Sequence, residues 1–190
     1  MLPIPELPIS MDAVPERLRR FADPAAPGPA QMMAARGMVP VKGGDLVLLL
    51  VQLTADSDPN VSSSAGDTLR ALPEGVLLPA CKEALPSAVF HEVALRFSNN
   101  DEVLARLAQN HAVADATIAE ISKHCVERIT ELIALNQQRL IGAPQIIEAL
   151  YKNRHTRMST ADRLIELAVR HDVEITGIPM FEELKKEIQG

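Results

Sequence analysis

The five histidines are the side chains best suited to acid–base or metal chemistry, and they are scattered through the chain at positions 91, 111, 124, 155 and 171. None has a second histidine three or four residues away, the spacing that places two metal ligands on one helix face. The run His91-Glu92-Val93-Ala94-Leu95 begins like the helix of a zinc protease, but Leu95 stands where the second histidine would be. The spacing therefore predicts no metal site.

Motifs for nucleophilic catalysis and phosphate binding also fail at particular residues. No Gly-x-Ser-x-Gly turn is present to expose a nucleophile. Gly43-Gly44 lacks the Lys-Ser/Thr pair of a phosphate loop and is interpreted as a flexible start of a helix. Cys81 and Cys125 have no Cys-x-x-Cys partner and are expected to be buried, reduced thiols rather than a disulfide. We therefore expect neither an enzyme nor a cofactor.

One segment differs from the rest by its charge. Between Arg139 and Arg170 there are six basic residues and three acidic ones, in a chain whose net charge is −6. This segment could hold a phosphate, a nucleic-acid backbone or an acidic partner helix. The alternative is a solvated turn whose arginines also bond helix carbonyl oxygens. The candidate binding residues are Arg139, Tyr151, Lys152, Arg154, His155 and Arg157.

The elements that would position these residues are predicted to be helices throughout. A short helix over 31–36 should end at Gly37, and Asp45 should cap a helix over 46–55, although a strand is a rival prediction for the apolar run there. Asp58-Pro59 should begin a helix that continues to Leu72. Asp115 and Ser159 are expected to cap two later helices. Further helices are predicted at 74–85, 86–97, 101–109, 115–123, 126–135, 143–151, 159–171 and 179–188.

The first 29 residues carry seven of the fourteen prolines and are predicted to form an irregular arm. One short helix is expected in it, over about 12–22. Residues 30–190 are then predicted to form a single helical domain. The arm also carries apolar residues such as Leu2, Ile4 and Phe21. We expect it to dock on the first helices or on a second copy, which would make the chain a homo-oligomer.

Composition restricts the class of protein further. Aromatic residues make up only 3% of the chain and there is no Trp, which favours helix packing over an all-β fold. The acidic balance argues against nucleic acid as the partner. The longest apolar run, 46–51, is too short to cross a membrane, and the Pro-rich start does not resemble a signal peptide. A cytoplasmic location is expected.

An apolar helix end followed by Asn recurs three times, at Asn110, Asn136 and Asn153. Each Asn is expected to end its helix in the left-handed conformation. The segment Asp56-Ser57-Asp58-Pro59-Asn60-Val61 with Leu69 resembles the turn and second helix of a HEAT-like repeat, except that Ser62 stands where such repeats commonly have Arg. Residues 99–173 are similar to the Asn-ended repeats of bacterial α-solenoid proteins, including leucine-rich-variant types. The alternative is a non-repetitive bundle with Asn at its corners.

This resemblance implies an all-α fold in which helix pairs stack as a short, degenerate α-solenoid behind the arm. It also implies a scaffold or protein-interaction role, and it brings no catalytic residues. A non-catalytic interaction module with a protein partner is therefore the expected function. The alternative is a nucleic-acid- or phosphate-binding domain that uses the basic residues at 139–170. A HEAT-like base-excision glycosylase is disfavoured because a pocket for a flipped base needs aromatic walls, and the chain has one Tyr and no Trp.

Overall fold

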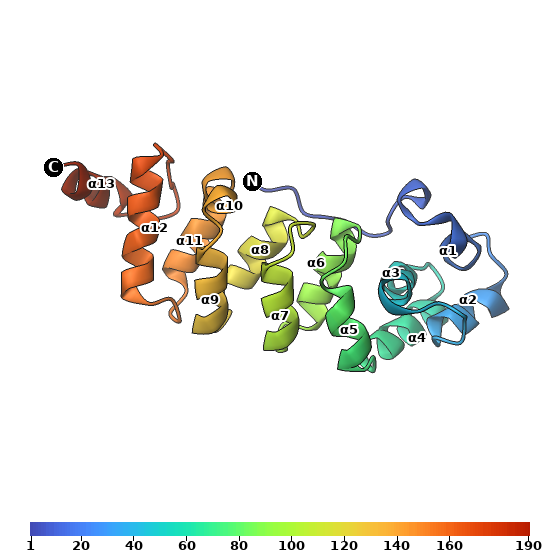
Figure 1. Ribbon diagram of the computed structural model, residues 1–190. Coiled ribbons are helices and arrows are strands. Elements are labelled where there is room, and N and C mark those ends of the chain that lie inside the picture. Colours follow the sequence, from blue (N-terminus) through green and yellow to red (C-terminus); the bar gives the residue numbers. More distant parts are fainter. The chain divides into compact units, whose positions relative to one another are not determined.

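The computed structural model describes residues 1–190 and contains thirteen α-helices, one 3-10 turn and no strand (Figure 1). The all-helical prediction is thus confirmed. The chain packs as two compact units. The N-terminal unit comprises Pro5–Phe97 and Asn110–Ala112, and the C-terminal unit comprises Met1–Ile4, Ser98–Gln109 and Val113–Gly190. No helix is both long and apolar enough to cross a membrane.

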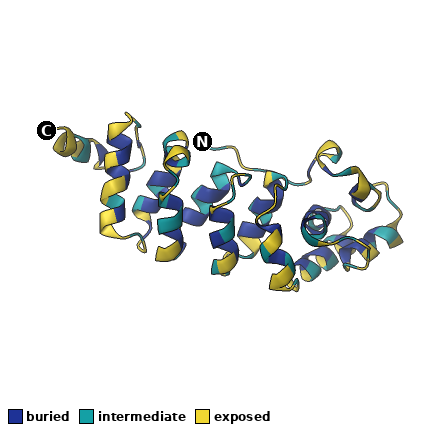
Figure 2. Ribbon diagram, viewed as in Figure 1, coloured by how far each residue is buried: buried dark blue, intermediate teal, exposed yellow.

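The N-terminal unit is built around one buried helix, α3 (Gly43–Thr54), which contacts all five other helices of the unit. Every residue from Val47 to Leu53 on it is buried, as Figure 2 shows. The apolar run is therefore a helix surrounded by neighbours and not the rival strand. The other helices of this unit are α1 (Glu16–Ala22), α2 (Gly28–Ala35), α4 (Pro59–Arg70), α5 (Glu74–Ala80) and α6 (Ser87–Arg96), after a 3-10 turn at Met11–Ala13.

In the C-terminal unit, helices that are not consecutive pack side by side in two layers. One layer contains α7 (Asp101–Ala108), α9 (Glu127–Ala134) and α12 (Met158–Arg170), with α9 in contact with both others. The second contains α8 (Asp115–Ser122) and α11 (Pro144–Lys152), which pack against each other (Figure 1). The short α10 (Gln137–Gly142) lies against α11 and α12, and α13 (Phe181–Gln189) packs on α12.

Proline and glycine set many of the helix boundaries. Pro73 and Pro86 occupy the N-cap positions of α5 and α6, and Pro59 is the first residue of α4, where its missing N–H costs nothing. The predicted cap at Asp58 is confirmed, since its side chain accepts a hydrogen bond of 2.9 Å from the Asn60 N–H. Gly37 follows α2 with a φ of +71°, as a helix-ending glycine should.

Three other predicted caps are wrong because their helices begin at or before the residue expected to cap them. Asp45 lies inside α3 and pairs with Arg17 at 2.7 Å. Asp115 is the first residue of α8 and makes no capping bond, and α12 begins at Met158, before Ser159. In each case the extended residue before the helix supplies no side-chain cap: Lys42, Ala114 and Arg157.

Several predicted boundaries also shift. The helix expected over 12–22 is a 3-10 turn followed by α1, because Pro15 fixes the backbone between them. The helix expected over 74–85 ends at Ala80, one residue beyond Pro79. The prediction missed α10 altogether, which Asn136 caps from its side chain.

Residues 5–29, expected to be an irregular arm, pack within the N-terminal unit. Ile9, Val14, Leu18 and Ala22 are buried there, and α1 lies on α3. The amide of Gln52 on α3 bonds both backbone groups of Ile9, accepting from its N–H at 2.7 Å and donating to its carbonyl at 2.8 Å. A buried amide that satisfies both backbone groups of one residue fixes this segment to α3.

Candidate interaction surface

Asn153, between α11 and α12, bridges two distant carbonyl oxygens through its side chain. Its amide nitrogen donates to the Ser122 carbonyl at 3.0 Å and to the Cys125 carbonyl at 2.9 Å. Its amide oxygen accepts from the His155 N–H at 2.8 Å. The residue is only 5% exposed, so water cannot reach these buried polar groups and the Asn153 side chain is the partner that satisfies them. Asn153 therefore ties the α11–α12 loop to the α8–α9 loop.

Asn110 makes the same set of bonds in the N-terminal unit. Its amide nitrogen donates to the carbonyls of Cys81 and Glu83 at 2.7 and 2.9 Å, and its oxygen accepts from the Ala112 N–H at 2.9 Å. Asn110 and Asn153, 43 positions apart in sequence, thus use the same hydrogen-bonding arrangement, and each holds a loop that lies 27 to 31 residues earlier. These shared hydrogen bonds are a more specific sign of a structural repeat than the recurrence of Asn in the sequence.

The predicted role of these asparagines is wrong in its mechanism. Among residues other than glycine only Asp172 has a positive φ, so none of Asn110, Asn136 and Asn153 adopts the left-handed conformation. Asn136 instead caps α10 by accepting from the Arg139 N–H at 3.1 Å. The physical reason is that a side-chain amide can hydrogen-bond the backbone groups of a neighbouring element. A helix that ends at a residue in the left-handed conformation satisfies only its own backbone groups.

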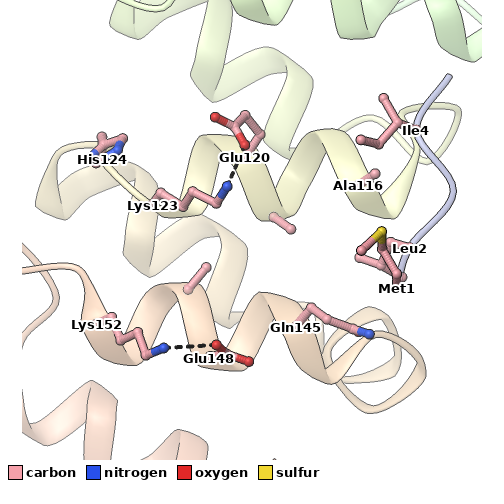
Figure 3. A pocket seen from close by; sticks show the side chains of 12 residues that line it. Met1, Leu2, Ile4, Ala116, Glu120, Lys123, His124, Gln145, Glu148 and Lys152 are labelled. Atoms are coloured by element: carbon pink, nitrogen blue, oxygen red, sulfur yellow. Dashed lines mark hydrogen bonds and ion pairs between the residues drawn. The ribbon is translucent and has the colours of Figure 1, made fainter. Parts of the chain in front are cut away.

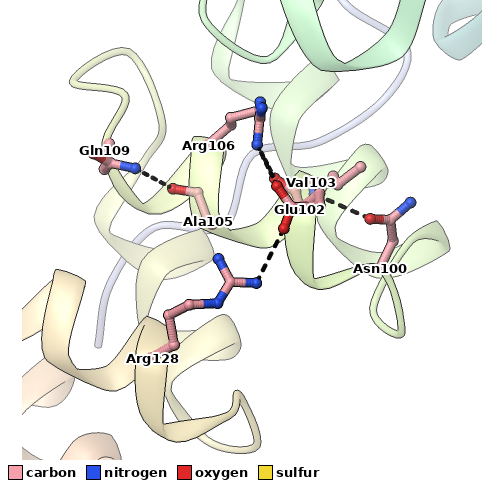
Figure 4. Close-up of polar contacts among 7 residues, drawn as sticks. All are labelled: Asn100, Glu102, Val103, Ala105, Arg106, Gln109 and Arg128. Carbon is pink, nitrogen blue, oxygen red and sulfur yellow. Dashed lines mark hydrogen bonds and ion pairs between the residues drawn. The ribbon is translucent and has the colours of Figure 1, made fainter. Parts of the chain in front are cut away.

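Acidic residues of one layer of the C-terminal unit pair with arginines on, or directly before, the next helix along that layer. We call these contacts the Glu–Arg ladder: Glu102–Arg128 at 3.2 Å, Glu127–Arg157 at 2.8 Å and Glu131–Arg163 at 3.6 Å. Its pairs join α7 to α9 and α9 to α12. At the first pair Glu102 also accepts from Arg106, as Figure 4 shows. That hydrogen bond and the charge of Arg128 lower the pKa of Glu102.

The predicted binding residues do not form one free basic surface. Arg139 has a side chain only 10% exposed, whose guanidinium bonds the Val113 carbonyl at 2.8 Å and Asp115 at 3.1 Å. Lys152 pairs with Glu148 at 2.9 Å. Arg157 belongs to the Glu–Arg ladder, and its hydrogen bond to Glu127 raises its pKa. Arg154 and His155 are exposed, and Tyr151 is half-buried.

A groove runs between α8 and α11 on the second layer of the C-terminal unit, with a volume of about 520 Å³. Its floor contains the small side chains of Ala116, Ala119 and Ala149. Two ion pairs border it, Glu120–Lys123 on α8 and Glu148–Lys152 on α11, and each closes within its own helix (Figure 3). His124 and Gln145 complete the lining.

The first residues of the chain also line this groove. Met1 and Leu2 lie at one end of it and Ile4 lies near Ala116 (Figure 3). The sequence prediction missed the groove because its walls come from three separate regions. The available signal was the pair Ala116 and Ala119, which share a face of α8 at a spacing of three.

Side chains capable of chemistry are not assembled elsewhere. His91 lies on α6, His171 caps the end of α12, and the other three histidines lie in separate loops. No group of three or more His, Cys, Asp and Glu side chains is placed to hold a metal ion. Cys81 and Cys125 are both buried and form no disulfide, and burial raises the pKa of the Cys125 thiol to about 12. A thiol held neutral in this way is a poor nucleophile.

A smaller cavity of about 230 Å³ lies in the N-terminal unit between Gly66, Arg70, Arg96 and Phe97. Each arginine has an acidic neighbour on its own helix, Asp67 for Arg70 and Glu92 for Arg96. These pairs leave the cavity without a concentrated positive charge.

No protein-family model matches the chain, nor does any curated protein or solved structure. The role of the surface must therefore be inferred from its own geometry.

Proposed function

We propose that this protein is a non-catalytic protein-interaction module, and that the helices of its C-terminal unit are a short run of degenerate helical repeats. The groove between α8 and α11 is the observation that carries the proposal. Its volume of about 520 Å³ falls within the roughly 300–1,000 Å³ typical of binding pockets. Its floor is apolar, and the charged residues at its border form ion pairs with one another.

The repeat part of the proposal is supported by contacts that recur between neighbouring elements. Asn110 and Asn153 bridge loops with the same bonds, and the Glu–Arg ladder links α7, α9 and α12 in succession. In repeat proteins each unit is stabilised mainly by its neighbours, so contacts between successive units are expected to recur. Repeat proteins use the face that successive units build together to bind their partners.

Large exposed apolar side chains give the partner additional contact area. Leu135 at the end of α9 is 75% exposed and Met158 at the start of α12 is 81% exposed. Apolar side chains of this size are normally buried when they act only in folding, although isolated exposed ones are common. We therefore treat them as secondary contacts on the other layer of the unit.

The alternative, a nucleic-acid- or phosphate-binding role for 139–170, has weaker support. Arg139, Lys152, Arg157 and Arg163 all have acidic partners within the chain. Binding to phosphates would require these pairs to break, which lowers the gain from each new contact. Titration of a DNA duplex at low and high salt distinguishes the roles, and a steep salt dependence would favour the alternative.

Site-specific photocrosslinking in native lysate tests the interaction role. A photoreactive residue is placed at Ala119 in the groove, at Met158, or at the exposed Ala71 at the end of α4 as a control. We expect one discrete protein adduct from the groove or Met158 position and none from Ala71, followed by a complex of defined stoichiometry from purified components. The absence of a protein adduct at every position would reject the role.

A further inference from the structure

We infer that the groove between α8 and α11 binds an extended, proline-containing segment of uncharged apolar residues, and that residues 1–4 of the chain cover it as an internal competitor. This inference rests on the proposed interaction role, whose partner it describes. It is drawn from the floor of the groove, the charges along its border and the segment that lies in it.

The floor limits the shape of the occupant. Ala116, Ala119 and Ala149 have short side chains, which let a peptide backbone approach closely. Both walls are helices whose backbone N–H and C=O groups bond within the helix. The groove therefore offers no strand edge, and an occupant's N–H groups would lose water without gaining a partner. Proline removes that donor, so a proline-containing extended segment avoids the penalty.

The border selects against charge. Glu120–Lys123 at 2.7 Å and Glu148–Lys152 at 2.9 Å neutralise each other on each helix. These pairs are exposed and breaking one would cost little, but a charged occupant would still lose water beside an apolar floor. An uncharged apolar segment complements this border without changing it.

The chain's own N-terminus has this chemistry. Met1-Leu2-Pro3-Ile4-Pro5 is apolar, has no charged side chain and contains two prolines. It covers the groove without being buried in it, since Met1 is fully exposed and Ile4 is 60% exposed. Apolar burial contributes only about 25 cal/mol per Å² removed from water, so a segment left this exposed gains little. A partner segment that inserts its side chains more deeply would displace it.

Binding of a defined peptide to the full-length chain tests the inference. The probe is a fluorescent five-residue peptide with the sequence of residues 1–5, and a peptide carrying Asp at the positions of Leu2 and Ile4 is its control. In the protein, the double variant Leu2→Asp/Ile4→Asp weakens the internal competitor. It is expected to bind the probe about fivefold or more tightly than the wild-type chain, because a larger fraction of grooves is open.

A second substitution blocks the groove without threatening the fold. Ala116 is the second residue of α8, where a carboxylate is favourable to the helix dipole, so Ala116→Glu should fold normally and abolish binding. Ser159→Glu adds the same charge at the second position of α12 and should leave binding unchanged. Circular dichroism and urea unfolding verify the fold of each variant.

Three results would overturn the inference: equal binding by the wild-type and the Leu2→Asp/Ile4→Asp chains, undiminished binding by Ala116→Glu, or equal binding of the Asp-substituted peptide. A dimer in light scattering that Leu2→Asp/Ile4→Asp abolishes would also overturn it, because the occupant would then be a second copy. Failure of the peptide to bind would leave the interaction role intact if crosslinking still yields an adduct at Met158.

Discussion

The side-chain amide of Asn153 donates to the carbonyl oxygen of Cys125 at 2.9 Å across 28 residues of sequence. The same nitrogen bonds the Ser122 carbonyl, so one buried amide satisfies both acceptors. Asn110 repeats this relationship with Cys81 and Glu83. The loops on which the candidate surface depends are thus held by single side chains, and their removal should be measurable.

Asn153→Ala should lower the free energy of unfolding by about 2–4 kcal/mol, because it leaves buried carbonyl groups without a donor. Asn153→Asp should cost more, since a carboxylate would face the same two carbonyl oxygens. Urea unfolding measures both variants. Asn136→Ala is the control, and as loss of an N-cap it should cost about 1 kcal/mol. Equal effects of the two alanine variants would refute the bridging role of Asn153.

Gln52→Leu should release the segment around Ile9 while leaving the rest of α3 folded. It removes both bonds to the Ile9 backbone, at 2.7 and 2.8 Å, and each buried group left unpaired costs about 1–3 kcal/mol. Detachment of the segment avoids that cost, so faster hydrogen exchange at the Ile9 N–H is the expected signal. Gln31→Leu, at a buried amide that bonds Asp23 and Asp56, should leave this exchange unchanged. Unaltered exchange in Gln52→Leu would contradict the role.

Arg139→Met should destabilise the chain by about 1–3 kcal/mol, because the Val113 carbonyl and Asp115 lose a nearly buried donor. The loss should persist in high salt, since buried pairs are weakly screened. Arg128→Met removes an exposed pair with Glu102 and should have a smaller, salt-sensitive effect. Thermal unfolding at two salt concentrations compares them. If the loss of stability caused by Arg139→Met disappears at high salt, Arg139 behaves as an exposed cation and the structural role is refuted.

Stability should fall above about pH 9 through the Cys125 thiol. Burial raises its pKa to about 12, so the folded state keeps the proton over a range where the unfolded state has lost it. The unfolded state then binds fewer protons, and stability decreases by up to about 1.4 kcal/mol per pH unit until the folded pKa is reached. Below the ordinary thiol pKa this contribution is fully present.

The measurement is the slope of unfolding free energy against pH, compared between the wild-type chain and Cys125→Ala. Other alkaline groups titrate in both proteins, so only the difference in slope reports the thiol. Slow reaction with a disulfide reagent at pH 8, accelerated by urea, is the accompanying expectation. Identical slopes in the two proteins would show that the thiol is not held neutral by burial.

Sequence reasoning succeeded where the signal was local. Pro59 after Asp58, Gly37 after α2, and the apolar run of α3 each determined a helix or its boundary, because dihedral preferences and burial act within a few residues. It failed for Asp115, whose carboxylate could cap a helix locally but bonds Arg139, 24 residues away. It also failed for α10, whose six residues are too few for a periodic pattern.

The sequence by itself determined that this chain is helical and where most of its helices lie. Only the tertiary structure decided which side chains come together: Asn153 with the loop at Ser122–Cys125, Glu127 with Arg157, and Ile4 in the same groove as Ala116. The backbone preferences of a helix are encoded in neighbouring residues, whereas the partners of an amide or a guanidinium depend on how helices pack. For that reason the basic residues at 139–157 looked available in the sequence, and most of them are paired in the fold.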